Sequence, residues 1–281
     1  MAAAESTGAR GFGAFAGLYP LGDGRLLAAS TDGVGTKLML ARERGALRVC
    51  GADLAAHCIN DVLTTGADPL ILLDYVAANR IDPEQVAELV EGAADVCRAA
   101  GVALVGGETA ELPGTYREGE LDFAGTCVGI VAADAVIDGS RVEEGDAIVA
   151  LRSSGVHANG FSLVRRVLEI EDYTGDDLLA PTCLYLDDVR MLKRLRVDVR
   201  ALAHVTGGGI EANLARVIPV GLRAEIFWDR VWEQLALPVF EWLARHVPKD
   251  EMQRVFNLGV GFCAIGPYPN ESLVIGRVRR A

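Results

Sequence analysis

Three short clusters within the first 113 residues combine carboxylates with glycine or amide groups. They are Asp32-Gly-Val-Gly-Thr-Lys37, the pair Asn60-Asp61, and Gly106-Gly-Glu-Thr-Ala-Glu-Leu-Pro113. Carboxylates are ligands that Mg²⁺ prefers. The backbone of glycine, which has no side chain, can approach a phosphate closely. Carboxylates buried without such a partner would be costly. The stretch from Thr31 to Pro113 therefore predicts a magnesium–nucleotide site.

The first cluster follows a predicted strand over residues 25–31. Gly33 and Gly35 would let backbone N–H groups surround a phosphate, Thr36 offers a hydroxyl, and Lys37 offers a positive charge. The spacing differs from that of a Walker A loop. A tight turn without a ligand is the alternative.

Polar residues also gather on one side of a predicted helix over residues 51–65. At 100° per residue this side holds Asp53, His57, Asn60, Asp61 and Thr64. A solvated face is one interpretation, but Lys, Arg and Glu are absent from it. Asp and Asn are poor helix formers, so their collection on one face indicates a local purpose such as metal coordination.

The third cluster is predicted to begin with a turn at Gly106 and Gly107, directly after a short strand over 102–105. Glu108 would then lie at the carboxyl edge of a sheet, where open α/β sheets bind ligands. A plain Gly-Gly turn with exposed glutamates remains the alternative.

Two glycine-containing loops in the second half add candidate groups. His157 and Asn159 lie in the loop Ser153-Ser-Gly-Val-His-Ala-Asn-Gly160, where a histidine could transfer a proton or bind an oxyanion. A buried structural histidine is the alternative, and Asn159 or Ser162 could cap the next helix. Thr206-Gly-Gly-Gly209 precedes a predicted helix. Its backbone could bind an anion at the helix N-terminus, or it could be a plain connector.

The elements that must position these groups alternate along the chain. In the first half the pattern predicts strands over 25–31, 69–77, 102–105 and 121–132, and helices over 51–65 and 83–100. The second helix has the strongest signals, with Asp82 as N-cap, Pro83 at the first position, Gln85 in a capping box and Gly101 at the end.

A turn at Asp138-Gly139 separates this half from a second one. There the pattern predicts strands over 147–151, 223–227, 258–265 and 272–279, a short element before Thr206, and helices over 159–170, 183–195, 210–217 and 236–246. We therefore expect two α/β domains, over residues 1–137 and 138–281.

Composition narrows the class of protein. The chain has 281 residues and a formal net charge of −12, which argues against binding to nucleic acid or an anionic membrane. Its six cysteines show no CxxC pair, which favours reduced thiols in the cytoplasm. No stretch approaches a membrane span or a signal peptide, so a soluble protein is expected.

Taken in order, the motifs resemble those of the phosphoribosylformylglycinamidine cyclo-ligase family, also called the aminoimidazole ribonucleotide (AIR) synthetase family, of purine biosynthesis. The resemblance covers about residues 10–265. Besides the first two clusters it rests on Gly106-Gly-Glu-Thr-Ala-Glu-Leu-Pro-Gly-Thr-Tyr116, His157-Ala-Asn-Gly-Phe-Ser-Leu-Val-Arg165, His204-Val-Thr-Gly-Gly-Gly209 and Phe256-Asn-Leu-Gly-Val-Gly261.

The resemblance implies a mixed α/β (α+β) fold of two domains. The N-terminal domain would pair with a second copy into a dimer β-barrel, and the C-terminal α/β domain would pack against it. The implied activity is the ATP- and Mg²⁺-dependent cyclisation of formylglycinamidine ribonucleotide to aminoimidazole ribonucleotide, ADP and phosphate. Phosphoryl transfer needs charge stabilisation more than a nucleophilic side chain, which suits a carboxylate–metal cluster.

The resemblance also implies roles for individual residues. Magnesium would be held by Asp32, Asp53, Asp61 and Glu108. Nucleotide or phosphate would be bound by Asp32, Gly33, Gly35, Thr36, Lys37, Asn60, Gly106 and Gly107. His157, Asn159 and Lys37 would serve the reaction, and Gly207 and Gly208 would bind the ribose phosphate.

The chain departs from the family pattern in four places. By this resemblance we expect the chain to lack a segment that covers ATP at the family's N-terminus and a helix before Val274, and to have a short segment between Leu168 and Leu178. His57 stands where methionine is usual. Other ATP-dependent members of the superfamily are therefore alternatives, resembling thiamine-monophosphate kinase, selenophosphate synthetase or hydrogenase-maturation proteins. A truncated nucleotide-binding dimer without turnover is a third.

Overall fold

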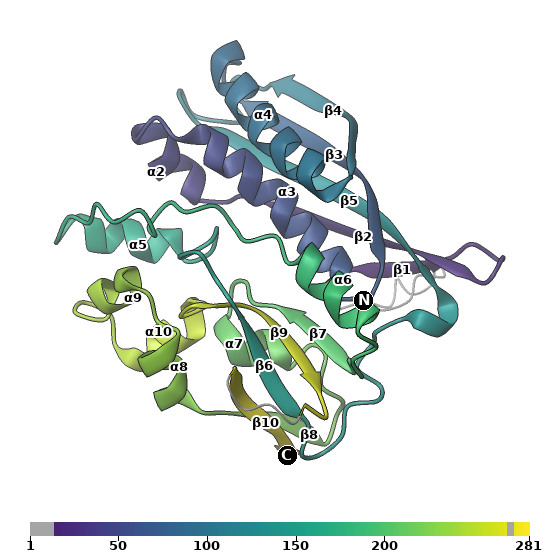
Figure 1. Cartoon of the computed structure of the whole chain (residues 1–281). Helices are drawn as coiled ribbons and strands as arrows, with labels where there is room; N and C mark the ends of the chain where they lie inside the picture. The colour runs from purple at the N-terminus through teal and green to yellow at the C-terminus, as the bar shows by residue number, and fades with distance from the viewer. Residues whose placement is uncertain (1–13, 269–272) are drawn as a thin grey trace.

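A computed structural model describes residues 14–268 and 273–281 of the chain, so the predictions for the N-terminal start and for residue 272 lie outside the described residues. Two mixed layers of sheet and helix are seen, one in the upper and one in the lower half of Figure 1. The first sheet contains β1 (Gly17–Pro20), β2 (Arg25–Gly33), β3 (Asp68–Ala78), β4 (Ala103–Glu111) and β5 (Leu121–Ala132).

The spatial order of this sheet is β1-β2-β5-β3-β4. Neighbouring strands are antiparallel except β3 and β4, which are parallel and joined by a helix. The helices of this half are α2 (Lys37–Glu43), α3 (Leu47–Leu63) and α4 (Pro83–Ala100). The predictions for β2, β3, β5, α3 and α4 are confirmed, with small shifts of their ends.

Helix α4 begins and ends as its sequence signals predict. The Asp82 carboxylate accepts hydrogen bonds from the backbone N–H groups of Glu84 and Gln85, at 3.0 and 3.4 Å. The Gln85 side chain donates to the same carboxylate, rather than reaching back to backbone as in the usual capping box. Gly101 ends the helix in the left-handed conformation, with φ 71°.

Helices α3 and α4 approach each other closely because two glycines face the contact. A Cβ added to Gly51 would lie 1.9 Å from the Leu89 carbonyl oxygen, and one added to Gly92 would lie 1.9 Å from that of Arg48. Side chains larger than hydrogen do not fit at these positions. The glycines therefore fix the place of α3, which carries the polar face predicted from the sequence.

The predicted turn at Gly106 and Gly107 is wrong. Strand β4 continues through both residues, and its pairing with β3 shifts by one residue at Val105. Gly106 has φ 150°, which side chains rarely allow, and a Cβ on Gly107 would lie 1.9 Å from Oδ1 of Asp74. Glycine thus permits a β-bulge and leaves room for a carboxylate, without ending the strand.

The second sheet contains β6 (Ala147–Arg152), β7 (Ala201–His204), β8 (Leu222–Ile226), β9 (Val260–Gly266) and β10 (Val274–Arg280), in the order β7-β9-β6-β10-β8. All its pairs are antiparallel. Its helices are α5 (Phe161–Leu168), α6 (Leu186–Arg194), α7 (Gly209–Leu214), α8 (Trp228–Gln234), α9 (Pro238–Leu243) and α10 (Lys249–Val255). Asn159 does not cap α5, whose N-cap is Gly160.

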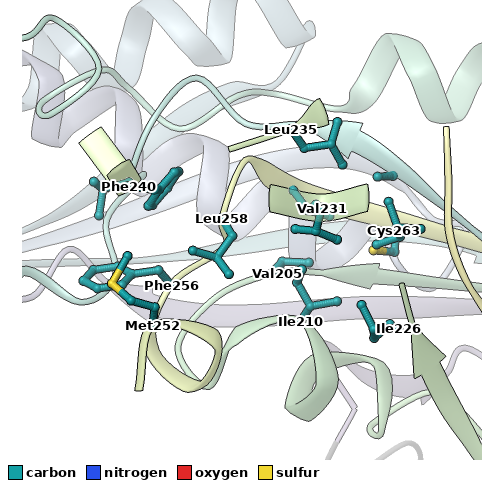
Figure 2. Packing of buried hydrophobic residues seen from close by; sticks show 14 of the residues in the cluster. Val205, Ile210, Ile226, Val231, Leu235, Phe240, Met252, Phe256, Leu258 and Cys263 are labelled. Carbon is teal, nitrogen blue, oxygen red and sulfur yellow. The ribbon is translucent and has the colours of Figure 1, made fainter. Parts of the chain in front are cut away.

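Both faces of the second sheet are covered. One face packs against α5 and α7 to α10, and Figure 2 shows Ile210, Val231 and Cys263 meeting in this core. Phe262 and Leu202 point to the other face and join a core that continues into α3, α4 and α6. The two halves of the chain therefore share one of their two hydrophobic cores.

Residues 133–146 connect the two sheets, and the predicted boundary at 137 falls within this segment. The sequence pattern predicts none of β1, α2, α8 and α10. The three helices have seven residues each, about two turns, which is too short for a helical period to be recognised.

No helix in the described part of the chain is long and apolar enough to cross a membrane. All six cysteines are free, and Cys183 alone among them is partly exposed.

A methyl group at position 51 tests the close contact between α3 and α4. We expect Gly51→Ala to lower the free energy of unfolding by about 1–3 kcal/mol, because the added Cβ overlaps backbone of α4. Gly17→Ala is the matched control, since its Cβ would lie 3.9 Å from the nearest atom. Equal stability of the two variants in urea denaturation would contradict the contact.

Candidate functional site

The polar face of α3 is buried at the seam between the two domains. Asp53 and Asn60 are 0% exposed, and His57 and Asp61 are 4% and 6% exposed. A solvated helix face is therefore excluded. Each of these four side chains has a partner from the C-terminal domain, so the seam is held by polar contacts along two turns of one helix.

Asp53 and Lys37 form a buried ion pair at the start of this face. Lys37 Nζ lies 2.7 Å from Asp53 Oδ2 and donates to the Ala180 carbonyl at 3.0 Å. Thr182 donates to Asp53 Oδ1 from both its backbone N–H and its hydroxyl, at 2.8 Å each. In this arrangement the charges of Lys37 and Asp53 neutralise each other. The prediction from the sequence was that Lys37 binds phosphate and Asp53 binds magnesium.

Asn60 ties α3 to the segment just before α6. Its Nδ2 donates to the Cys183 carbonyl at 2.8 Å, and its Oδ1 accepts the Tyr185 N–H at 3.0 Å. The amide thereby satisfies two backbone groups of an extended segment. This segment, residues 180–185, provides hydrogen bonds to both Asp53 and Asn60 of α3.

Asp61 and Asp32 form an acidic pair next to this seam. Asp61 Oδ1 accepts from Nδ1 of His204 at 2.8 Å, and its Oδ2 accepts from the Ser30 hydroxyl at 3.1 Å. Burial raises the pKa of both carboxyl groups, and the charge of Asp61 raises the pKa of Asp32 further. Burial lowers the pKa of His204 to about 3, so this histidine is neutral.

The acidic pair fits a divalent cation in part. Asp32 Oδ2 is buried and has no hydrogen-bond partner among the described residues, and a cation would stabilise two carboxylates that repel each other. Within residues 14–268 and 273–281, no three acidic, histidine or cysteine side chains form a complete metal site. Magnesium is commonly held by one or two carboxylates with water and substrate phosphates, which two carboxylates satisfy.

His57 and His157 both lie in the seam, with different partners. Asn159 Nδ2 lies 3.3 Å from His57 Nε2, and the His57 and His204 rings are 4.9 Å apart. His157 is fully buried, and its Nε2 accepts from the backbone N–H groups of Ser154 and Cys183 at 3.3 and 3.4 Å. Burial lowers the pKa of His157, so it is a neutral group that holds two loops together.

The first glycine cluster is exposed beside a groove. Gly35 and Thr36 line a groove of about 230 Å³ together with Arg42, Tyr116 and Asp122. Gly33 is exposed as well, while the lysine that follows is buried. The Thr36 hydroxyl lies 3.2 Å from that of Ser162 in α5, so this loop also lies at the seam. The loop is thus exposed and poor in side chains next to the acidic pair, and its contact with a phosphate stays a prediction.

The glycine loop of residues 206–209 is held by one amide. Asn213 Nδ2 donates to the carbonyls of Thr206 and Gly209, at 3.2 and 2.8 Å. Gly207 and Gly208 are exposed, and Gly208 has φ 100°. Asn159 Oδ1 lies on the Gly207 side of this loop, 3.4 Å from the position of a Cβ there. The loop and Asn159 thus lie together.

Glu108 does not join the acidic pair within one chain. The pairing places Asp32, Gly125, Asp74 and Gly107 in one row, and Gly33, Ala124, Tyr75 and Glu108 in the next. Adjacent rows point to opposite faces, and β2 and β4 are three strand spacings, about 14 Å, apart. The Glu108 side chain therefore points to the face of the sheet away from α3. Gly106 and Gly107 lie on the same strand and are also about three strand spacings from Asp32.

Three residues of the seam were not predicted as site residues: Ser30, Thr182 and His204. Ser30 is an ordinary strand residue without a sequence signal, whereas Thr182 ends Leu179-Ala-Pro-Thr182, one of the segments in which the chain resembles the family. His204 directly precedes the Thr206 glycine loop and is one of four histidines. That position was the available signal for it.

Comparison with known proteins shows to which family the chain belongs. The family described as AIR synthase related protein matches with its N-terminal domain over residues 13–131 and its C-terminal domain over residues 143–277. A phosphoribosylformylglycinamidine cyclo-ligase of Synechococcus sp. (strain CC9605) is 47% identical, over 96% of this chain and 82% of the relative. The chain belongs to the cyclo-ligase family. A cyclo-ligase of Rippkaea orientalis is 42% identical, over 94% of this chain and 82% of the relative.

Members of this family are ATP-dependent, with Mg²⁺ as the usual partner of ATP. A chloroplastic/mitochondrial relative from Vigna unguiculata is 47% identical, over 92% of this chain and 69% of the relative. Among solved structures, thiamine monophosphate kinase from Aquifex aeolicus has a TM-score of 0.68 at 14% identity, covering 100% of this chain and 93% of that one. The E. coli hydrogenase maturation protein HypE has a TM-score of 0.66 at 20% identity, covering 91% and 81%. These likenesses confirm the two-domain fold.

The buried ion pair can be tested through stability. We expect Lys37→Met to lower the free energy of unfolding by about 3–5 kcal/mol, because Asp53 stays buried without its cation. The double variant Lys37→Met/Asp53→Leu is expected to lose less than the single one, measured by urea denaturation.

Lys249→Met is the control, at an exposed lysine that lies over Trp232. It is expected to lose less than about 1 kcal/mol. A Lys37 variant as stable as this control would show that the pair does not hold the seam.

Proposed function

We propose that this protein closes the imidazole ring of aminoimidazole ribonucleotide from formylglycinamidine ribonucleotide, with ATP as phosphoryl donor. The observation that carries the proposal is the acidic pair Asp32–Asp61, which lies beside the exposed Gly33–Thr36 loop and the seam that holds Asn159. The names of the relatives, at 42–47% identity over most of the chain, support the substrate.

Each part of the site has a task in this reaction. Asp32 and Asp61 would hold Mg²⁺, which supplies charge stabilisation to the phosphates of ATP when bound. Gly33, Gly35 and Thr36 would contact the phosphates. The amide oxygen of the substrate would receive the γ-phosphoryl group, and a nitrogen of the same substrate would then displace phosphate and close the ring.

The C-terminal domain would bind the ribonucleotide. Asn159 faces the Gly207–Gly208 loop, and the loop presents exposed backbone for a ribose phosphate. His157 is buried and neutral, so its task would be to hold the 153–160 loop in place and not to carry a charge. Lys37 would act in the same structural way through Asp53.

We propose further that the protein is a homodimer formed by the open face of the first sheet. On this face Tyr19, Leu73 and Tyr75 are 57%, 38% and 37% exposed, although they lie on strands. An apolar sheet face exposed to water is typical of an interface. Glu108 lies on the same face, so its predicted metal role depends on what a second copy brings near it. The free cysteines support a reducing compartment such as the cytoplasm.

The ring-closing activity has a direct assay. The full chain is incubated with ATP, Mg²⁺ and formylglycinamidine ribonucleotide, and the aminoimidazole product is detected by diazo coupling. We expect product and ADP in equal amounts. ADP formation with thiamine monophosphate or another acceptor, without aminoimidazole, would assign the chain to a different reaction, and nucleotide binding without turnover would assign it to none.

Asp32→Asn is the variant that links this activity to the acidic pair. It keeps the size of the side chain and removes the charge, so we expect loss of turnover with little loss of stability. Glu171→Gln, at a carboxylate paired with His246 on the surface, is the matched control and should keep full activity.

The proposed dimer is tested by placing a charge on the open face. Leu73→Lys should give a monomer in light scattering, because a buried lysine without a partner is costly. Ile170→Lys, at an apolar residue that is 69% exposed after α5, should not change the mass. A wild-type monomer would refute the dimer.

A further inference from the structure

His57 forms a hydrogen bond to a side chain of the C-terminal domain. Its partner is Nδ2 of Asn159, 3.3 Å from its own Nε2. An amide NH₂ group can only donate, so with the Asn159 nitrogen toward His57 the lone pair is on Nε2 and the hydrogen on Nδ1, which has no hydrogen-bond partner among the described residues. Burial and the nearby His204 lower the pKa of His57 to about 4, so a neutral ring is present at ordinary pH.

The same bond goes with one orientation of Asn159. An amide can turn by 180° and exchange its oxygen and nitrogen, and a histidine whose Nε2 carries the lone pair accepts only from the nitrogen. Asn159 Oδ1 therefore points away from His57, to the Gly207 side of the glycine loop, and has no partner among the described residues. His57 comes from α3 of the N-terminal domain and Asn159 from the C-terminal domain, so the contact spans the seam.

His57 itself has little freedom to move. It is 4% exposed, its ring lies 4.9 Å from that of His204, and His204 is tied to Asp61. A rigid acceptor is thus held between the acidic pair and Asn159. The arrangement decides which atom of the amide faces a ligand.

We propose that His57 is a positioning residue that makes Asn159 present a hydrogen-bond acceptor to the substrate. The group that Asn159 recognises is then a donor, such as an N–H of an amide or amidine. This assignment rests on the proposed function, because it takes the ligand to be the nitrogen-rich ribonucleotide. An acceptor fixed in advance favours such a group over a carbonyl or carboxylate at the same place.

Two variants of His57 separate positioning from packing. His57→Gln keeps an acceptor oxygen and His57→Leu removes it at similar size. We expect His57→Leu to lower kcat for ring closure about 10- to 100-fold with the KM for ATP unchanged, since a misplaced group costs rate. His57→Gln should recover most of this loss. His246→Gln, at a histidine outside the seam, should keep the wild-type kcat.

The pairing with Asn159 is tested by the double variant. If His57 acts through Asn159, His57→Leu/Asn159→Ala should have the kcat of Asn159→Ala alone. If the losses of kcat in the two single variants multiply in the double variant, the proposal is overturned. An unchanged kcat in His57→Leu would overturn it as well. Equal losses in His57→Leu and His57→Gln would do the same, because packing and not the acceptor would then matter.

A second readout does not depend on activity. In the protein with ¹⁵N-labelled histidine, NMR should show His57 with hydrogen on Nδ1 alone, assigned by its loss in His57→Gln. In Asn159→Ala the ring should shift to a mixture of both tautomers. An unchanged tautomer would overturn the contact. An inactive wild type with the expected change would refute the proposed function and support the contact.

Discussion

The arrangement of the whole protein depends on the burial of one polar helix face. Helix α3 carries Asp53, His57, Asn60 and Asp61 into a seam where they are almost entirely hidden from water. Burying such side chains is costly unless each of them finds a hydrogen-bond partner for at least one of its polar atoms. The segment 180–185, Asn159 and His204 supply these partners, so the second domain completes what the first cannot satisfy alone.

This constraint explains why the two domains behave as one structure. The apolar core that surrounds α3 continues into α6 and one face of the second sheet, and the polar contacts fix its register. A shift of either domain would leave Asn60 without its partners and would take the hydrogen bonds of Ala180 and Thr182 from the Lys37–Asp53 pair. The acidic pair Asp32–Asp61 lies next to the same seam. The polar contacts there fix the position of the pair, which hydrophobic packing alone would not define.

The sequence predicted the elements well where their signals are local. Helix α4 has a cap at each end, and β3 is a near-continuous apolar run. The predicted turn at Gly106 failed because glycine there serves a bulge and the space of Asp74, which only the paired strand reveals. Lys37 and Asp53 illustrate the same limit, since residue type shows that each is charged but not that each is the other's partner. His204 and Thr182 approach α3 only through the fold.

The central claim is that the Asp32–Asp61 pair holds the metal of a nucleotide site. Its most direct test is the crystal structure with Mn²⁺ and a non-hydrolysable ATP analogue, read through the anomalous signal of the metal. The account predicts an anomalous peak within about 2.3 Å of a carboxylate oxygen of both Asp32 and Asp61. A peak bound to Glu108 or Asp74 instead, with the pair bonded only to protein, would contradict it.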